Sequence, residues 1–276
     1  MAKRQMDARA PRACCWGFGA GRSRRFDDSS SLLKTGASFF PHIYCRGNPA
    51  PTARKTHIRR PISTRRTALF ACSAAPAKTG IDRLLPPGRD RLGGGSCFGV
   101  DYAMIRVGYR GYDQGGLHID AYAEANLQGA LDAGLPVGVY FYSQAISVEE
   151  AREEANMLLD FIRDWDITYP VVFDWEWVGA DARTAEVSGR TVTDCTLAFC
   201  RMVQEAGYKP AFYFNQDLAQ NTFRLRELQE FDFWLAQYQD AMTFAYDVDM
   251  WQYSCTGRVA GITGDVDLNL CFKSYE

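Results

Sequence analysis

Pro170-Val-Val-Phe-Asp-Trp-Glu-Trp177 is an apolar segment that ends in two acidic residues. Proline at its start and the run from Val171 to Phe173 predict a buried strand. Side chains alternate between the faces of a strand, so Asp174 and Glu176 point the same way, with Cα atoms about 6.6 Å apart. In a confined site, mutual repulsion raises the pKa of one acid and leaves a proton donor beside an anion. Two ordinary surface acids at a strand end are the alternative.

The sequence around this strand alternates strands with helices. Further strands are predicted at 79–82, 101–109, 135–143, 209–215, 232–238, 249–254 and 265–269. Helices are predicted at 119–133, 147–164, 193–206 and 224–230, the second opened by the capping box Ser147-Val-Glu-Glu150. Helices separate the first five strands, and the last three follow one another closely. Alternation of this kind predicts a parallel α/β sheet, and eight strands indicate closure into a barrel.

In such a barrel the site lies where the strands end. Acidic, aromatic and amide residues gather at these ends: Asp82, Tyr140, Tyr142, Asp174, Glu176, Tyr213, Asn215, Gln237, Gln252, Asp267 and Asn269. Four acids with aromatic neighbours are typical of a site that cleaves glycosidic bonds. Tyr140, Tyr142, Tyr213 and Trp251 are candidates to stack on sugar rings, or they belong to the core. Arg106 either pairs with one of the acids or is exposed.

The first 78 residues differ from the rest in charge. They carry 16 Lys and Arg against three acids, whereas residues 79–276 carry 15 against 30. They are rich in Arg, Ser, Pro and Gly without a period of 2 or 3.6, so we predict a disordered basic segment. A transit peptide or a nucleic-acid-binding arm is a less favoured interpretation. The predicted domains are therefore 1–78 and a barrel over 79–276.

Cysteine spacing and hydropathy exclude other classes of protein. The nine cysteines form no CxxC or Cys/His pattern, so no metal site and no cofactor are expected. No apolar run approaches the roughly 20 residues that span a membrane, and no convincing signal peptide is present.

Several stretches of the chain resemble the glycoside hydrolase family 25 lysozymes. The matching stretches, in family order, are Gly80-Ile-Asp82, MIRVGYRG (104–111), GLPVGVYFYSQA (134–145), PVVFDWE (170–176), GYKPAFYFN (207–215), FWLAQY (233–238) and DMWQYSCTGRVAGITGDVDLN (249–269). The resemblance implies an irregular TIM-like (β/α)5β3 barrel. It also implies cleavage of peptidoglycan between N-acetylmuramic acid and N-acetylglucosamine.

By this resemblance Glu176 is the general acid, and Asp174 orients the 2-acetamido group or stabilises developing positive charge. Asp82 and Asp267 complete the acidic floor, while Tyr140, Tyr142, Tyr213, Asn215, Gln237 and Trp251 are the predicted substrate-binding residues. The implied protein is a monomer, secreted or associated with the cell wall, whose partner is a glycan strand rather than nucleic acid or a membrane. An inactive wall-binding barrel and a chitinase-like glycosidase are the alternatives.

The segment RLLPPGRDRLGGGSCF (83–98) departs from the family pattern. Its two prolines and three consecutive glycines disfavour the first helix expected there. DNA that encodes it can be written so that a frame one base later gives VSSHQGEIDWEAVAAS, a segment like that of family members. We therefore hypothesise that 83–98 is a frameshift product and that 1–78 is mistranslated or wrongly started. The coding DNA tests both ideas.

Overall fold

The computed structural model describes residues 77–83, 100–259, 262 and 264–275. The strands of this part of the chain are β1 (Lys78–Arg83), β2 (Tyr102–Arg110), β3 (Leu117–Ile119), β4 (Val137–Ser143), β5 (Val171–Trp175), β6 (Pro210–Asn215), β7 (Asp232–Ala236), β8 (Met250–Gly257) and β9 (Val266–Cys271). Its helices are α1 (Ala123–Asp132), α2 (Val148–Ile162), α3 (Gly189–Glu205), α4 (Gln216–Asn221) and the 3-10 helix η1 (Leu225–Glu227). The predicted disordered segment, except its last two residues, and the aberrant segment beyond Arg83 lie outside the described residues.

Eight strands form a closed barrel, as the sequence predicts. Hydrogen bonds run from β1 through β2, β4, β5, β6, β7, β8 and β9 and return to β1. The pairs from β1 to β8 are parallel, whereas β9 is antiparallel to both β8 and β1. The short strand β3 pairs antiparallel with the end of β2, beside the stretch of β2 that pairs with β1.

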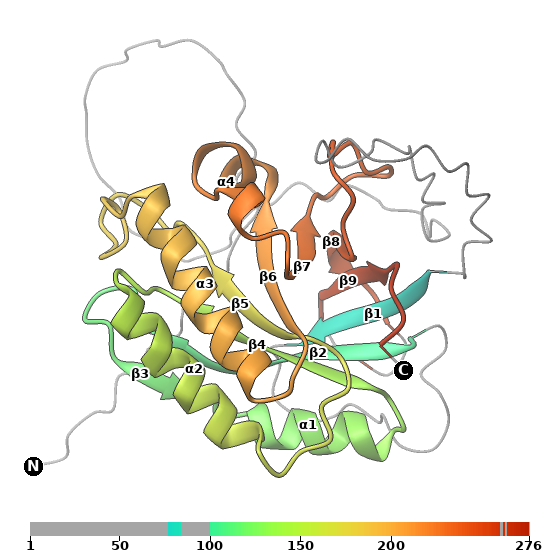
Figure 1. The fold of residues 1–276 in the computed structure, drawn as a ribbon. Coiled ribbons are helices and arrows are strands. Elements are labelled where there is room, and N and C mark those ends of the chain that lie inside the picture. Colours follow the sequence, from blue (N-terminus) through green and yellow to red (C-terminus); the bar gives the residue numbers. More distant parts are fainter. Residues whose placement is uncertain (1–76, 84–99, 260–261, 263, 276) are drawn as a thin grey trace, which may run out of the picture. The chain divides into compact units, whose positions relative to one another are not determined.

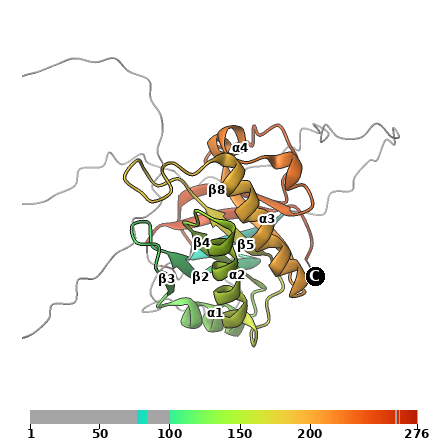
Figure 2. The ribbon, with the colours of Figure 1, turned by 60° about the vertical axis from the view of Figure 1, so that its left-hand side comes forward.

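Helices cover only part of the barrel (Figure 1). Helix α1 follows β3, α2 follows β4 and α3 follows β5, and α2 and α3 pack side by side in both views (Figures 1 and 2). After β6 the connections contain only α4 and η1, and no helix separates β7, β8 and β9 in the described residues. The late strands are therefore nearly bare, which agrees with the (β/α)5β3 pattern.

Three helix boundaries differ from the predictions. The helix expected at 119–133 begins at Ala123, because 117–119 form β3. The helix expected from Thr193 begins at Gly189, since the Ser188 side chain accepts a hydrogen bond from the backbone N–H of Thr191 and caps it. The helix expected at 224–230 is only the 3-10 turn η1, and the six-residue α4 was not predicted.

Large aromatic side chains fill the barrel interior below the site. Tyr140 and Tyr213 pack edge-on against Trp234, with ring centroids 6.0 and 5.1 Å from it. Tyr102 fills the space beside Gly80, where an added Cβ would lie 2.1 Å from its ring. The interior beneath the strand ends is thus filled by side chains.

Candidate active site

The barrel register places the four predicted acidic residues on one rim. Asp174 is paired with Tyr142 on β4 and with Tyr213 on β6, and Glu176 lies just beyond the end of β5. Asp82 on β1 lies directly opposite Asp267 on β9. The four carboxylates therefore come from three strands that are distant in sequence.

Asp267 reaches this rim for a reason that the sequence pattern did not reveal. The prediction placed it at the end of a parallel strand, but it is the second residue of β9. Because β9 runs antiparallel to its neighbours, its beginning lies at the rim where the parallel strands end. The position was right and the assumed strand direction was wrong.

The site raises the pKa values of all four carboxyl groups. Burial is the largest cause for each, and neighbouring negative charge adds to it. The pKa of Glu176 rises to about 7 and that of Asp267 to about 6, and those of Asp82 and Asp174 rise well above their ordinary value. After burial, the charge of Glu176 is the largest cause that raises the pKa of Asp174, so these two carboxyl groups titrate as a pair that holds a proton near neutral pH.

A network of neutral polar groups supports the acidic floor. The Gln252 amide Nε2 donates to Asp82 Oδ2 over 3.5 Å, and the Tyr140 side chain lowers the pKa of Asp82 against the larger effect of burial. Gln252 Oε1 accepts hydrogen bonds from the hydroxyls of Tyr213 at 2.8 Å and Tyr238 at 2.9 Å. Buried oxygens Oδ1 of Asp82 and of Asp174 have no hydrogen-bond partner among the described residues. Each carboxyl group therefore retains an acceptor on the floor.

Arg106 supplies the positive charge nearest to the carboxylates. Its guanidinium pairs with Asp120, with Nη2 2.6 Å from Oδ2, and lies 5.3 Å from the Tyr109 ring. It also lowers the pKa values of Asp82 and Asp174, against the larger effect of burial. The sequence predicted that Arg106 either pairs with one of the site acids or is exposed. Arg106 is largely buried and forms an ion pair, but its partner is Asp120 rather than one of the four site carboxylates.

The structure brings three of the six predicted substrate-binding residues to the acids. Tyr140 and Tyr213 are buried, while Tyr142 is partly exposed. The pKa of the Tyr142 hydroxyl is raised by burial and then by Glu176 and Asp174, which places it beside both carboxylates. Of the three, Tyr142 is thus the one whose ring is most open to a ligand.

The other three predicted residues have structural partners of their own. Asn215 caps α4, with Oδ1 accepting from the backbone N–H of Leu218. The Gln237 amide bonds to Gln216, the first residue of α4, and to Thr243 in the loop after β7. Trp251 is fully buried, lies on the opposite face of β8 from Met250 in the interior, and donates from Nε1 to the Gln237 carbonyl. The structure does not bring Trp251 to the carboxylates.

Three further residues lie near the site. Gln252, expected at a strand end but given no catalytic or binding role, bonds directly to Asp82. Tyr238 was not predicted; it is 41% exposed, and its hydroxyl donates to Gln252. Trp177, which follows Glu176, is 54% exposed. Its position directly after Glu176 in the sequence could have indicated that Trp177 lies at the site. Tyr238 and Trp177 offer exposed rings at this rim.

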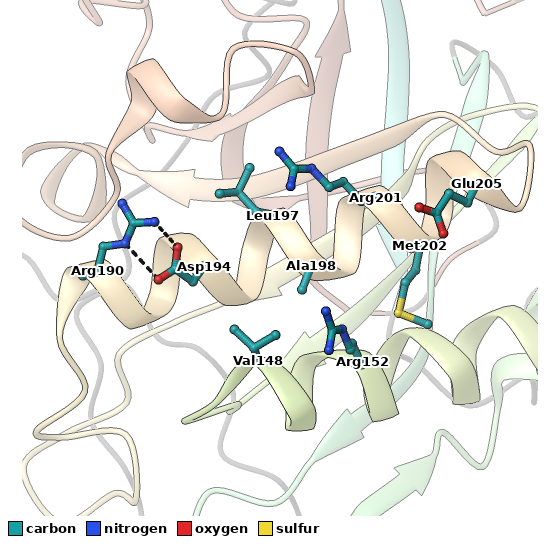
Figure 3. Close-up of a pocket in the computed structure, with 9 residues that line it drawn as sticks. All are labelled: Val148, Arg152, Arg190, Asp194, Leu197, Ala198, Arg201, Met202 and Glu205. Atoms are coloured by element: carbon teal, nitrogen blue, oxygen red, sulfur yellow. Dashed lines mark hydrogen bonds and ion pairs between the residues drawn. The ribbon is translucent and has the colours of Figure 1, made fainter.

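A second concave surface lies between α2 and α3 (Figure 3). Val148 and Arg152 of α2 face side chains of α3 that include Arg190, Asp194 and Met202. Arg190 donates a hydrogen bond to Asp194 and forms an ion pair with Glu227 of η1. None of the four carboxylates lines this groove, so it is separate from the acidic site.

The described residues contain no group of three or more His, Cys, Asp or Glu side chains arranged to hold a metal ion. Cys195, Cys200 and Cys271 are buried thiols, and none of the described helices has the length and apolar character needed to cross a bilayer. The chemistry available at the rim is carboxylic acid–base chemistry beside aromatic surfaces. A barrel with such a rim defines a protein of the glycoside hydrolase class.

The chain belongs to glycosyl hydrolases family 25, whose sequence model matches residues 99–262. Asp174 and Glu176 lie inside the matched range, whereas Asp82 and Asp267 lie outside it. The uncharacterized protein YegX of Escherichia coli K12 is 26% identical over 159 residues, which are 55% of this chain and 54% of YegX. The chain therefore spans about half the length of the curated relatives it matches.

Solved structures show the same fold. The modular autolysin LytC from Streptococcus pneumoniae, in complex with a synthetic peptidoglycan ligand, superposes with a TM-score of 0.58 at 23% identity, over 70% of this chain and 46% of LytC. The bacterial lysozyme from Streptomyces coelicolor gives 0.57 at 22% identity, over 72% and 94%. The spore cortex lytic enzyme SleM of Clostridium perfringens gives 0.60 at 18%, over 71% and 67%. The predicted irregular barrel is confirmed.

Proposed function

We propose that the chain is a peptidoglycan hydrolase that cleaves the β-1,4 bond between N-acetylmuramic acid and N-acetylglucosamine. One observation carries the proposal. Asp174 and Glu176 lie together at the end of β5 on the rim of a family 25 barrel, and their raised pKa values keep a proton on the pair near neutral pH. A lysozyme and an autolysin bound to a peptidoglycan ligand share this fold, which supports the choice of substrate.

In this proposal Glu176 is the general acid. Its pKa of about 7 leaves it protonated in a large fraction of molecules at neutral pH, so it can protonate the departing glycosidic oxygen. Asp174, Asp82 and Asp267 provide negative potential beneath the oxocarbenium-like transition state. Tyr142, with the exposed rings of Tyr238 and Trp177, would contact the sugar faces.

The placement of Asp174 and Glu176 fits a substrate-assisted route. The two residues follow one another at alternate positions of the β5 chain, so their side chains project from the same face, with Glu176 just beyond the strand end. Asp174 would then bind the 2-acetamido group of the sugar whose glycosidic oxygen Glu176 protonates. The acetamido oxygen of the substrate would attack the anomeric carbon while Glu176 gives up its proton. Water would then open the oxazolinium ring, returning a proton to Glu176.

An inactive wall-binding barrel is the second candidate, because one sequence observation favours it. The segment at 83–98, which we propose is a frameshift product, lies outside the family match, which begins at residue 99. Incubation with insoluble peptidoglycan separates the two functions. A hydrolase releases soluble sugar, whereas a binding barrel sediments with the wall and releases none.

The pKa of Glu176 predicts the pH dependence of the activity. After burial, the charge of Asp267 is the next cause that raises this pKa. Activity that needs protonated Glu176 should fall about tenfold per pH unit above 7. Asp267→Asn removes a negative charge, stabilises ionised Glu176 and should move this decline to lower pH. Profiles of kcat/KM between pH 4 and 9 measure the shift.

Asp265→Asn is the matched control for this prediction. Asp265 is exposed, is ion-paired with Arg258 at 2.9 Å, and affects Asp267 rather than Glu176. Its substitution should leave the decline of activity in place. Equal shifts in the two variants would show that general surface charge, and not the floor carboxylate, sets the profile.

A further inference from the structure

Glu176 lies beyond the hydrogen-bonded ladder that holds β5. The register between β4 and β5 ends at the pair Ser143 and Trp175. The next residue on each chain, Gln144 and Glu176, therefore has no partner in that ladder. A proton donor at this position needs another restraint, because misplacement by about 1 Å can cost roughly 100-fold in rate.

The Gln144 side chain provides the missing contact. It is fully buried, and its Nε2 donates to the backbone carbonyl of Glu176 over 2.8 Å and to that of Ser143 over 2.9 Å. Its Oε1 accepts from the hydroxyl of Thr184, also fully buried, at 3.0 Å. Thr184 thus orients the Gln144 amide, and the amide in turn holds the Glu176 backbone. This contact takes the place of one more backbone hydrogen bond between the two strands.

A second bond joins the same two chains. Trp175, the last residue of β5 and the one before Glu176, donates from its indole Nε1 to the carbonyl of Ala145, the residue after Gln144, over 3.1 Å. The two chains that leave the barrel here are therefore joined at Trp175 and at Glu176. Of the two bonds, the one from Gln144 is made to Glu176 itself.

An ion pair fixes the loop that carries Thr184. Arg183 donates to the carbonyl of Gln144 at 2.6 Å and to both carboxylate oxygens of Glu150 at 2.6 and 2.7 Å. Burial would raise the pKa of Glu150, but the bonds from Arg183 and the Ile146 N–H outweigh it and lower that pKa. Glu150 lies in the first turn of α2, so the loop is anchored to a helix.

We propose that Gln144 is a positioning residue that sets the place of Glu176 relative to the acidic floor. The role rests on the proposed function, in which Glu176 donates the proton. Gln144 touches no reacting atom; it acts through the Glu176 backbone, with Thr184 and Arg183 behind it. An alternative is that the amide only satisfies buried polar groups and stabilises the fold.

Gln144→Met tests the proposal, because methionine has a similar length and no donor. The control is Thr196→Val, which removes an equally buried hydroxyl whose bond goes to the Val192 carbonyl inside α3. Two readouts are compared in the full-length chain. One is kcat and KM on peptidoglycan, and the other is hydrogen–deuterium exchange of residues 176–182, which does not depend on activity.

We expect Gln144→Met to lower kcat about 30- to 100-fold with KM within about threefold. Exchange in residues 176–182 should rise at least tenfold. Thr196→Val should change none of these values more than about twofold. If the unchanged chain proves inactive while exchange still rises in Gln144→Met alone, the proposed function fails and the positioning role stands.

Equal exchange in the two variants would overturn the positioning role, as would equal effects on kcat. If Gln144→Met does not fold, Thr184→Val decides, because it removes only the hydroxyl that orients the amide. It should produce a smaller rise in exchange over the same residues. Exchange no different from that of Thr196→Val would then overturn the proposal.

Discussion

Glu176→Gln is expected to lower kcat/KM for peptidoglycan by on the order of 1,000-fold, the range for loss of a general acid. Glutamine has nearly the same volume but no proton to give to the leaving oxygen at any pH. The backbone carbonyl that accepts from Gln144 is unchanged, so the fold and the binding of the wall should be retained. Release of soluble sugar and co-sedimentation with insoluble peptidoglycan measure the two effects separately.

Glu124→Gln is the matched control for this substitution. Glu124 is exposed on α1, so the same change in charge and volume should leave activity within about twofold of the original. A Glu176→Gln protein that keeps more than a tenth of the activity would contradict the assignment. The proton would then have to come from another carboxyl group of the floor.

Glu154→Ala is expected to cause the largest loss of stability, about 3 kcal/mol in the free energy of unfolding. Glu154 is fully buried on α2 and accepts from Arg110 Nε at 2.7 Å. Burial raises its pKa to about 7, even with Arg110 beside it. Its removal leaves the buried Arg110 with the carbonyls of Gly115 and Glu150 and with more exposed carboxylates. These remaining partners place the cost at the low end of the range for broken buried pairs.

Glu153→Ala is the control, because Glu153 contacts the same guanidinium at 3.0 Å from a side chain that is 58% exposed. Its loss should cost less than about 1 kcal/mol. Urea unfolding of the two variants gives the comparison. Equal costs would show that Arg110 does not depend on its buried partner. The double variant Arg110→Met with Glu154→Leu should recover much of the lost stability, since it buries no unpaired charge.

The sequence predicted correctly those strands and helices whose formation depends on residues close together in the chain. The apolar run before Asp174 gave the buried strand β5, and Ser147 does cap α2 by accepting from the Glu150 N–H. Ser188 was overlooked as a cap, so the start of α3 was placed four residues late. The direction of β9 was also missed, because a short strand of alternating pattern looks the same whichever way it runs.

The site was predictable where it depends on residue type and less so where it depends on long-range contacts. Asp82, Asp174 and Glu176 lie at or just beyond the ends of parallel strands, where the sequence pattern points to them. Asp267 lies at the start of an antiparallel strand, which the sequence pattern does not reveal. Trp251 has the same alternation as Met250 and Gln252, and only the register shows that it faces away from the interior. The bond between Gln144 and Glu176 joins residues 32 positions apart. No spacing rule in the sequence indicates such a contact.

We propose that this barrel cleaves the glycan strand after N-acetylmuramic acid. Purified peptidoglycan digested with the protein, reduced with borohydride and analysed by mass spectrometry, identifies the sugar at the new reducing end. We expect reduced N-acetylmuramic acid ends, which should be absent from a parallel digest with the Glu176→Gln protein. Reduced N-acetylglucosamine ends, or no new ends while the protein remains bound to the wall, would contradict it.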